Sequence, residues 1–344
     1  MRQKFLKHLL WLMILPAVLV ASCEQTTLGE IEFFGYKGLD TDAVRKALPF
    51  REGDKFPPAG VKSSEELKQI VSERIARTIG HEPTDISFVC CDSHGQFMAY
   101  IGLRGDSSQA AVFNPAPQGD VRMPESAVKL RAELDEVWME AVMKGMAAED
   151  DSQGYALTNY PPARSKELEL RDFALHNEAL IFDVLHSSSD AQHRAIAAQA
   201  LGYGRQSKEQ VEALVHASFD SDAGVRNDAI RALEVLAGAK PDLAQWIPVE
   251  AFIPMLNSGT WSDRNKATLL MECVTRSRDA AVLRKLRAGA ADSLIEMARW
   301  RSMGHAFSAR VLLGRIAGIE EDPLREMAAA GKVDAILAAV RRAP

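Results

Sequence analysis

The chain is poor in cysteine, with only Cys23, Cys90, Cys91 and Cys273 among its 344 residues. Four cysteines are too few for the disulfide framework that stabilises small secreted domains. Cys90 and Cys91 are neighbours, and because adjacent strand residues point to opposite faces, a disulfide between them is possible but strained. Cys273 lies in an apolar helical pattern, where we expect it to pack as a small hydrophobic side chain.

Basic residues are outnumbered, since 41 Lys and Arg face 47 Asp and Glu and the formal net charge is −6. Phosphate binding needs clustered Lys and Arg, so the composition argues against a nucleic-acid partner and against a polybasic membrane patch. Motifs for cofactors are also missing, because the sequence contains neither a P-loop nor a Gly-x-Gly-x-x-Gly. His176, His186 and His193 have no Cys or Glu at a recognised metal-ligand spacing. We therefore expect neither a cofactor nor a metal.

Long apolar runs are missing apart from Leu9–Val20, which follows Arg2, Lys4 and Lys7. About twelve apolar residues are too few to span a bilayer comfortably. The order of cationic, apolar and small residues is typical of a secretory signal. An ordinary cleaved signal and an uncleaved anchor are the alternatives to the interpretation that follows.

The end of this run, Leu19-Val20-Ala21-Ser22-Cys23, resembles a bacterial lipobox. The resemblance implies that residues 1–22 are a removable signal peptide and that the Cys23 thiol carries a diacylglyceryl group. Two or three acyl chains exceed the marginal hold of a single chain on a membrane. We therefore expect an exported lipoprotein that is anchored to the membrane and faces the periplasm. Glu24 is not the Asp associated with inner-membrane retention, which favours the outer membrane.

Residues 29–105 follow a strand, helix, helix, strand, strand pattern. Ile31–Gly35 alternates as a strand does, and Ser63 with Glu66 fits a capping box at the start of a helix. Two alternating segments then flank the turn at 92–95, which indicates a hairpin.

Three segments in this region carry a resemblance: Ile31-x-Phe33-x-Gly35, the run Leu48–Phe56, and Leu103-Arg104-Gly105. Together they resemble a polypeptide-transport-associated (POTRA) domain. The resemblance implies a small α+β domain of β-α-α-β-β order that docks extended peptides against the edge of its sheet.

A Pro-rich segment, residues 106–123, is expected to be a linker between two separately folding parts. Residues 124–164 are predicted to form a long helix followed by a loop at 151–164. Loops of this length in a compact region are often functional, although a poorly ordered connector is the alternative. We expect Tyr155 and Tyr160 in this loop to contact a partner protein, because aromatic residues are enriched at binding hot spots.

Beyond Ser165 the chain repeats itself, with Asp190 and Arg194 recurring as Asp222 and Arg226. Fainter copies follow at 264–267 and 309–313, separated by further apolar helical patterns. One helix pair cannot bury both of its apolar faces, so neighbouring pairs must stack.

These repeats resemble HEAT repeats of the bacterial lyase-associated kind. The resemblance implies that Asp190 and Asp222 cap helices and that Arg194 and Arg226 belong to a ladder of polar contacts between repeats. The predicted fold class is therefore mainly α, a HEAT-like α-solenoid at 165–344 preceded by the small α+β domain.

The functional prediction is a non-catalytic, membrane-anchored scaffold of the bacterial cell envelope that binds another protein. The alternative is a regulatory or maturation factor for a partner enzyme. A cell-envelope hydrolase is disfavoured, because Ser126-x-x-Lys129 is not accompanied by the other motifs of the penicillin-recognising enzymes.

Overall fold

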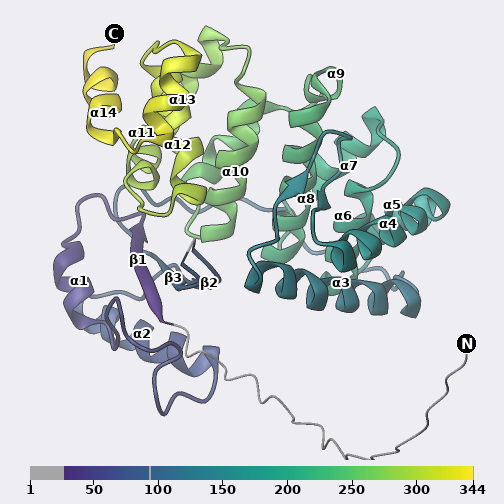
Figure 1. Cartoon of the computed structure of the whole chain (residues 1–344), viewed down its shortest axis with the longest axis horizontal. Helices are drawn as coiled ribbons and strands as arrows, with labels where there is room; N and C mark the ends of the chain where they lie inside the picture. Colours follow the sequence, from purple (N-terminus) through teal and green to yellow (C-terminus); the bar gives the residue numbers. More distant parts are fainter. Residues whose placement is uncertain (1–26, 93, 344) are drawn as a thin grey trace, which may run out of the picture.

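The computed structural model describes residues 27–92 and 94–343. The predicted signal and Cys23 lie outside the described residues. Figure 1 shows a small strand-containing region followed by a large array of helices. The first region has the predicted β-α-α-β-β order. Its elements are β1 (Leu28–Phe34), α1 (Thr41–Ala47), α2 (Ser64–Ile79), β2 (Asp85–Val89) and β3 (Phe97–Gly102).

The sheet has the order β1-β3-β2, with β1 parallel and β2 antiparallel to the central strand β3. The Ser63 half of the capping box at the start of α2 is confirmed, because Ser63 Oγ accepts a hydrogen bond from Glu66 N over 3.1 Å. Glu66 Oε2 in turn accepts from the amide of Lys62 over 2.7 Å. Gly80, with φ of +84°, ends α2 in the left-handed conformation that glycine tolerates.

Both faces of this sheet are buried, which explains why β3 is apolar along its whole length. Ala99 and Ile101 pack with α1 and α2 in one core. Met98 and Tyr100, which alternate with them, pack with Phe34 into the core of the helical array. The two parts that were expected to be separate therefore share an interface, because the array covers one face of the sheet.

After the non-helical segment 106–123, the described chain is mostly helical and contains one short hairpin. Residues 151–164, expected to be a loop, instead contribute to this hairpin and to the helix that starts at Pro161. The elements before the repeats are α3 (Glu125–Met143), β4 (Glu149–Asp150), β5 (Leu157–Thr158) and α4 (Pro161–His176). The repeats comprise α5 (Glu178–Ser187), α6 (Ala191–Gly202), α7 (Lys208–Ala217), α8 (Ala223–Ala239), α9 (Pro241–Ala244), η1 (Val249–Phe252), η2 (Pro254–Asn257), α10 (Trp261–Val274), α11 (Ala280–Ala298), α12 (Met303–Ile316), α13 (Glu321–Ala329) and α14 (Val333–Arg342).

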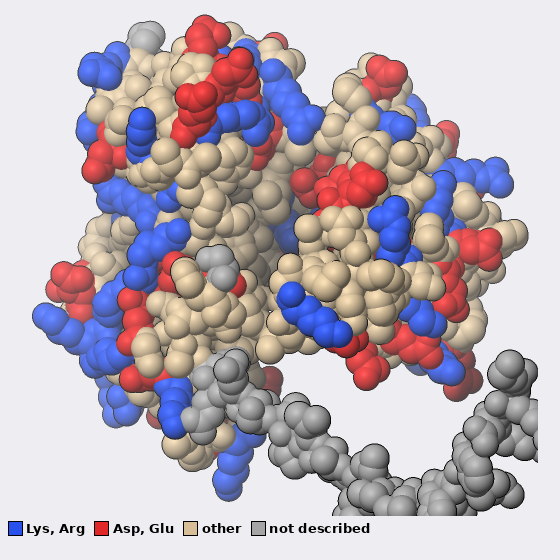
Figure 2. Space-filling model, in the orientation of Figure 1, with Lys and Arg blue, Asp and Glu red and all other residues tan. Residues whose placement is uncertain are grey.

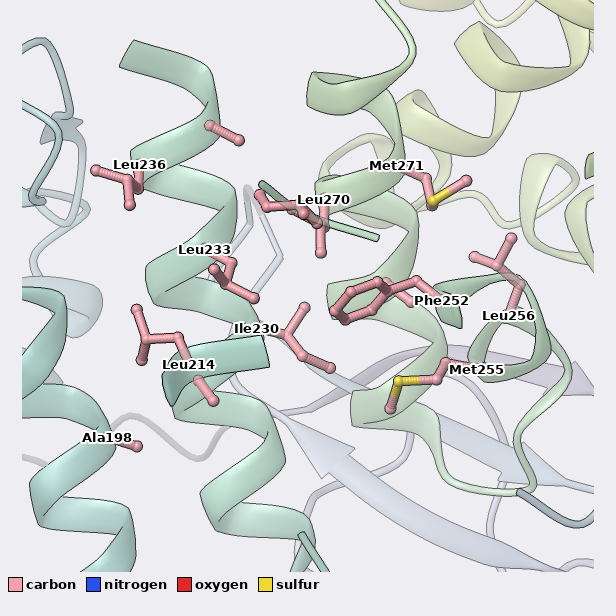
Figure 3. Close-up of a cluster of buried hydrophobic side chains, with 14 of the residues drawn as sticks. Ala198, Leu214, Ile230, Leu233, Leu236, Phe252, Met255, Leu256, Leu270 and Met271 are labelled. Atoms are coloured by element: carbon pink, nitrogen blue, oxygen red, sulfur yellow. The ribbon is translucent and has the colours of Figure 1, made fainter. Parts of the chain in front are cut away.

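The second helices of the repeats, α6, α8, α10 and α12, pack side by side. Between them lies a continuous core, shown in Figure 3, in which Leu214, Ile230, Leu233 and Leu270 are fully buried. One of the apolar helical patterns between the repeat copies, at 252–256, instead forms two 3-10 turns, η1 and η2. Proline interrupts the helix, because Pro254 has no amide hydrogen to donate to the preceding turn; it instead begins η2.

Residues 106–123 form an ordered strap along the array in place of the expected linker. The backbone amides of Gln109, Asn114 and Gly119 donate to carbonyls in the turns before α10, α8 and α6, over 2.8, 2.7 and 2.8 Å. These partners are far away in sequence, so a Pro-rich composition does not reveal them. The strap ties the turns of three repeats together.

No helix within residues 27–92 and 94–343 is both long and apolar enough to cross a membrane.

Candidate partner-binding site

The two aspartates of the repeat signature cap helices, as the resemblance implies. Asp190 Oδ1 accepts from the amide of Gln192 at the start of α6 over 2.9 Å. Asp222 Oδ1 accepts from the amide of Val225 at the start of α8 over 3.0 Å. Each cap satisfies an amide that has no partner within its own helix.

The two signature arginines form buried ion pairs between repeats, but with other acids than the capping ones. Arg194 binds Asp220 with Nε and Nη2, over 2.7 and 2.8 Å. Arg226 binds Asp263 in the same bidentate way, over 2.8 and 3.0 Å. Such paired contacts to a carboxylate fix geometry as well as charge.

The ladder continues into the repeats whose signature is faint. Arg264 Nη1 lies 3.3 Å from Glu296 Oε2, and both side chains are buried. Burial lowers the pKa of Arg264 to about 10, and Glu296 partly offsets this. Arg310 has no acid and donates instead to the carbonyls of Ala298 and Trp300, both over 2.9 Å.

Glu296 also joins the array to the strand-containing region. Its carboxylate accepts from three consecutive amides after β1, those of Gly35, Tyr36 and Lys37, over 2.7, 3.0 and 3.0 Å. The Ser107 hydroxyl donates to the same carboxylate over 2.5 Å. Successive backbone amides form an anion-binding concavity, so one buried acid holds two parts of the chain together.

A cavity of about 230 Å³ lies between α3, the β4–β5 hairpin and the helices α4, α6 and α8. Aromatic side chains on three different elements contribute to its wall: Trp138 on α3, Tyr155 in the hairpin and Tyr203 after α6. Trp138 is 37 % exposed, which places it at the rim. The wall therefore combines aromatic faces with the charged groups described next.

Carboxylates outnumber cations in this cavity. Arg131 is bound by Asp135 and Asp228, each over 2.9 Å. Arg231 pairs with Glu149 of the hairpin. Both arginines are thus occupied by acids.

Glu167 on α4 is the acid in the cavity wall without a cation in contact. It is only 1 % exposed. Its Oε2 accepts from the amide and the hydroxyl of Thr158, over 2.7 and 3.2 Å. Burial raises the pKa of Glu167, although these hydrogen bonds oppose the shift. The cavity is acidic as a whole.

A second polar surface adjoins the cavity between the hairpin and α8. Burial raises the pKa of Glu234 and of Asp151 on this surface. Lys266 of α10 lies near Glu234, and burial together with Arg231 lowers the pKa of Lys266 to about 8. Figure 2 shows a hollow in the molecule with acidic side chains gathered beside it.

The two tyrosines predicted to bind a partner differ in their surroundings. Tyr155 lines the cavity, with the Arg171 guanidinium 3.9 Å from the centre of its ring. Tyr160 is buried against Ala141 and Ala163, and its hydroxyl bonds to Lys144 over 2.8 Å. Tyr160 therefore stabilises the start of α4, and its predicted role as a contact residue is corrected.

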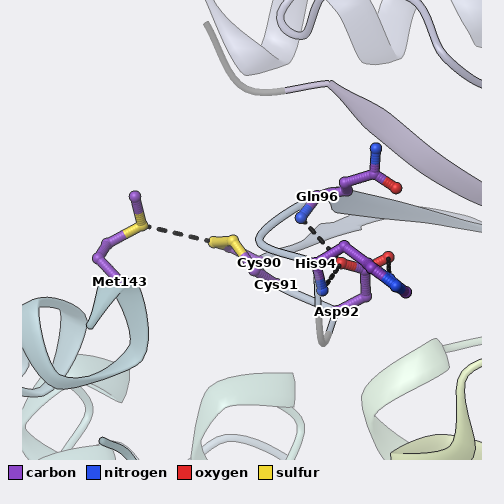
Figure 4. Close-up of a disulfide and its surroundings, with 6 residues drawn as sticks. All are labelled: Cys90, Cys91, Asp92, His94, Gln96 and Met143. Carbon is purple, nitrogen blue, oxygen red and sulfur yellow. Dashed lines mark hydrogen bonds and ion pairs between the residues drawn. A yellow bond between two sulfur atoms is a disulfide. The ribbon is translucent and has the colours of Figure 1, made fainter. Parts of the chain in front are cut away.

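The cysteines and histidines within residues 27–92 and 94–343 do not come together as a metal site. Cys90 and Cys91 form a disulfide, and Cys90 Sγ lies 3.8 Å from Met143 Sδ (Figure 4). Burial raises the pKa of the Cys273 thiol to about 12, in keeping with its expected packing role. Among the residues described, no three His, Cys, Asp or Glu side chains cluster in a way that could hold a metal ion.

The sequence interpretation missed Glu167, Arg231 and Asp228 as parts of a site. A local signal existed, since Asp228 and Arg231 are charged residues three apart on a helix that is otherwise mostly apolar. Such residues lie on one face of a helix. Without the position of α3 and the hairpin, however, that face looks like ordinary solvated surface.

Comparison with known proteins supports the repeat assignment. Residues 178–268, from α5 into α10, match the family of HEAT repeats. No curated protein matches the chain. An engineered protein of known crystal structure is similar at a TM-score of 0.38 and 16 % identity, covering 63 % of this chain and 98 % of that one. A designed armadillo repeat protein in complex with the peptide (KR)4 is similar at 0.37 and 15 %, with the same coverage. The chain is mainly helical, with a HEAT-like solenoid and a small strand-containing region before it.

Proposed function

We propose that this protein is a non-catalytic scaffold of the bacterial cell envelope that binds another protein through the cavity between α3, the hairpin and α8. The single observation that carries the proposal is an aromatic and acidic cavity beside the inner helices of a repeat solenoid. Stacked repeats present extended surfaces of this kind, which such proteins use for binding. The repeat fold is consistent with a protein-interaction scaffold, and aromatic groups are typical anchors at interfaces.

The membrane part of the proposal rests on the sequence before residue 27. The lipobox-like segment supports acylation of Cys23, export to the periplasmic side and, through Glu24, sorting to the outer membrane. Between Cys23 and β1 there are only a few residues, so the acyl chains would hold the strand-containing region near the membrane surface.

A second candidate function is peptide docking at the sheet edge, as the POTRA resemblance implies. One edge is already occupied, because the Leu28 amide donates to the Asp54 carbonyl over 2.9 Å and the Ile31 amide to Glu52 over 3.1 Å. The opposite edge, β2, adjoins a surface depression that it shares with α2. An extended peptide would therefore add beside β2.

In vivo photo-crosslinking tests the scaffold proposal. A photoreactive amino acid at Trp138 should give adducts with a defined protein, because Trp138 is at the cavity rim. The same group at the exposed Glu212 of α7 is the matched control and should give none. Adducts at both positions alike, or at neither, would contradict a partner bound at the cavity.

The alternative, a regulatory or maturation factor, shares the binding step but requires that the partner is an enzyme whose activity changes on binding. Measuring the activity of the captured partner with and without this protein separates the two. A hydrolase would be indicated if the purified protein turned over a peptidoglycan, ester or peptide substrate and one substitution, such as Glu167→Gln, abolished it.

A further inference from the structure

The cavity wall holds a buried polar atom without a partner, and this atom is an acceptor. Gln199 Oε1 is buried and accepts no hydrogen bond. On the adjoining surface, outside the cavity wall, Asp151 Oδ1 is also buried and without a donor. A buried acceptor without a donor costs free energy. A ligand that fits this site must therefore supply hydrogen-bond donors.

The ion pairs of the cavity leave one acid, Glu167, without a cation in contact, although Arg231 lies near enough to lower its pKa slightly. Arg131 and Arg231 are already paired with Asp135, Asp228 and Glu149. Glu167 is left with hydrogen bonds from Thr158 but with no positive charge in contact. A buried ionised carboxylate without a counter-charge is costly, and the raised pKa of Glu167 reflects that cost. A cation entering the cavity would offset it.

The aromatic side chains and the volume of the cavity further restrict which cationic ligand can bind there. Trp138, Tyr155 and Tyr203 line the cavity, and the Tyr155 ring already has the Arg171 guanidinium 3.9 Å from its centre, which shows that this ring accepts such a group. Aromatic ring faces attract cations and stack on planar guanidinium groups. A cavity of roughly 150 Å³ holds a molecule the size of benzene, so about 230 Å³ has room for one side chain. Ligand pockets for larger molecules begin at roughly 300 Å³.

We propose that the cavity binds a single arginine side chain of the partner protein, with the guanidinium on Glu167 and between the aromatic rings. Arginine satisfies all three requirements, because it carries a permanent charge, five N–H donors and a planar face. Lysine supplies a positive charge and hydrogen-bond donors, but it has no planar group that could stack on the aromatic rings. This inference rests on the proposed function, since it names the group through which the partner is held.

Calorimetric titration of the purified protein tests the inference. The probes are N-acetyl-arginine amide, N-acetyl-lysine amide and N-acetyl-citrulline amide, which has nearly the shape of arginine without its charge. We expect arginine to bind at least tenfold more tightly than citrulline and more tightly than lysine. Equal binding of arginine and citrulline would overturn the proposal, and lysine binding as tightly as arginine would overturn the guanidinium assignment.

A matched pair of variants on α4 and a third variant in the hairpin locate the binding. Glu167→Gln keeps the size of the side chain and should abolish the tenfold preference for arginine over citrulline. Glu169→Gln, an exposed acid on the same helix, should leave that preference unchanged. Tyr155→Leu should weaken arginine binding, and circular dichroism verifies that each variant is folded. If Glu167→Gln is folded and retains the preference, the arginine binds elsewhere and the proposal is wrong.

Failure of this inference is distinguishable from failure of the proposed function. The titration needs no partner protein, whereas crosslinking at Trp138 needs no arginine. Adducts at Trp138 without arginine binding would leave the scaffold intact and refute only the choice of side chain.

Discussion

Replacing Glu296 by glutamine should lower the free energy of unfolding. The Glu296 carboxylate neutralises Arg264, and it accepts hydrogen bonds from backbone amides in the turn after β1. Both side chains are buried, so the guanidinium would lose its acid without gaining water. Removing one partner of a buried ion pair costs about 3–5 kcal/mol. The amides of Gly35, Tyr36 and Lys37 would also lose a charged acceptor, which places the expected loss at the upper end of that range. Domains typically have about 5–15 kcal/mol of stability in total.

Equilibrium urea unfolding measures this loss directly. Tryptophan fluorescence is a suitable signal, since Trp261 and Trp300 both contact Tyr100 of the sheet at ring-centre distances of 5.0 Å. The matched control is Asp292→Asn, one turn earlier on α11. Asp292 also contacts Lys37, but that pair is about half exposed on both sides, so its loss should cost less than about 1 kcal/mol. Equal effects of the two substitutions would refute the reasoning.

Three further predictions address the core, the sheet interface and the anchor. Leu233→Asp should lower the free energy of unfolding by several kcal/mol in urea titration, because it places an unpaired charge in the core between repeats; wild-type unfolding would show that Leu233 is not packed there. Burial lowers the pKa of His305 from its ordinary 6.5 to about 4, with Lys266 contributing. The unfolded chain therefore takes up the proton first, and stability should fall as the pH drops from 6.5 to 4, by about 3 kcal/mol in all; His305→Gln should flatten this part of the pH profile, and an unchanged profile would assign it to other groups. Cys23→Ala should move the protein out of the detergent phase in phase partitioning, and acyl labelling that persists in the variant would contradict the assignment of Cys23.

Features set by short-range physics could be predicted from the sequence. The helix caps of Ser63, Asp190 and Asp222 depend on residues within a few positions of each cap, and each element of the β-α-α-β-β region follows from its own local pattern. The buried position of Leu233 followed from the repeat register. Each of these is specified by local hydrogen bonding or by helical periodicity.

Features set by contacts between distant segments could not be predicted. Arg226 pairs with Asp263 and Arg264 with Glu296, acids whose spacing from the arginines follows no repeat signature. The strap at 106–123 looks like a linker because proline-rich composition says nothing about carbonyls in distant turns. The sheet was expected to form a separate domain, because nothing in β3 shows that Tyr100 meets helices some 160 residues later in the chain.

The candidate site also could not be predicted from the sequence, because it depends on contacts between distant segments. Tyr155 could be selected from composition, but so could Tyr160, and only packing separates a cavity wall from a buried anchor of α4. Glu167 carries the site's unbalanced charge, yet on the sequence it is one of several acids on a helix. Glu167 becomes part of a cavity only because α3 and the hairpin pack next to it.

Hydrogen-exchange mass spectrometry of the protein alone and in complex with its crosslinked partner tests the central claim most directly. A partner seated at the cavity should slow exchange in α3, in the hairpin at 149–158 and in α8, while β2 and α2 exchange as in the free protein. Protection confined to β2 and α2, with no change around the cavity, would place the partner on the sheet edge and contradict the account.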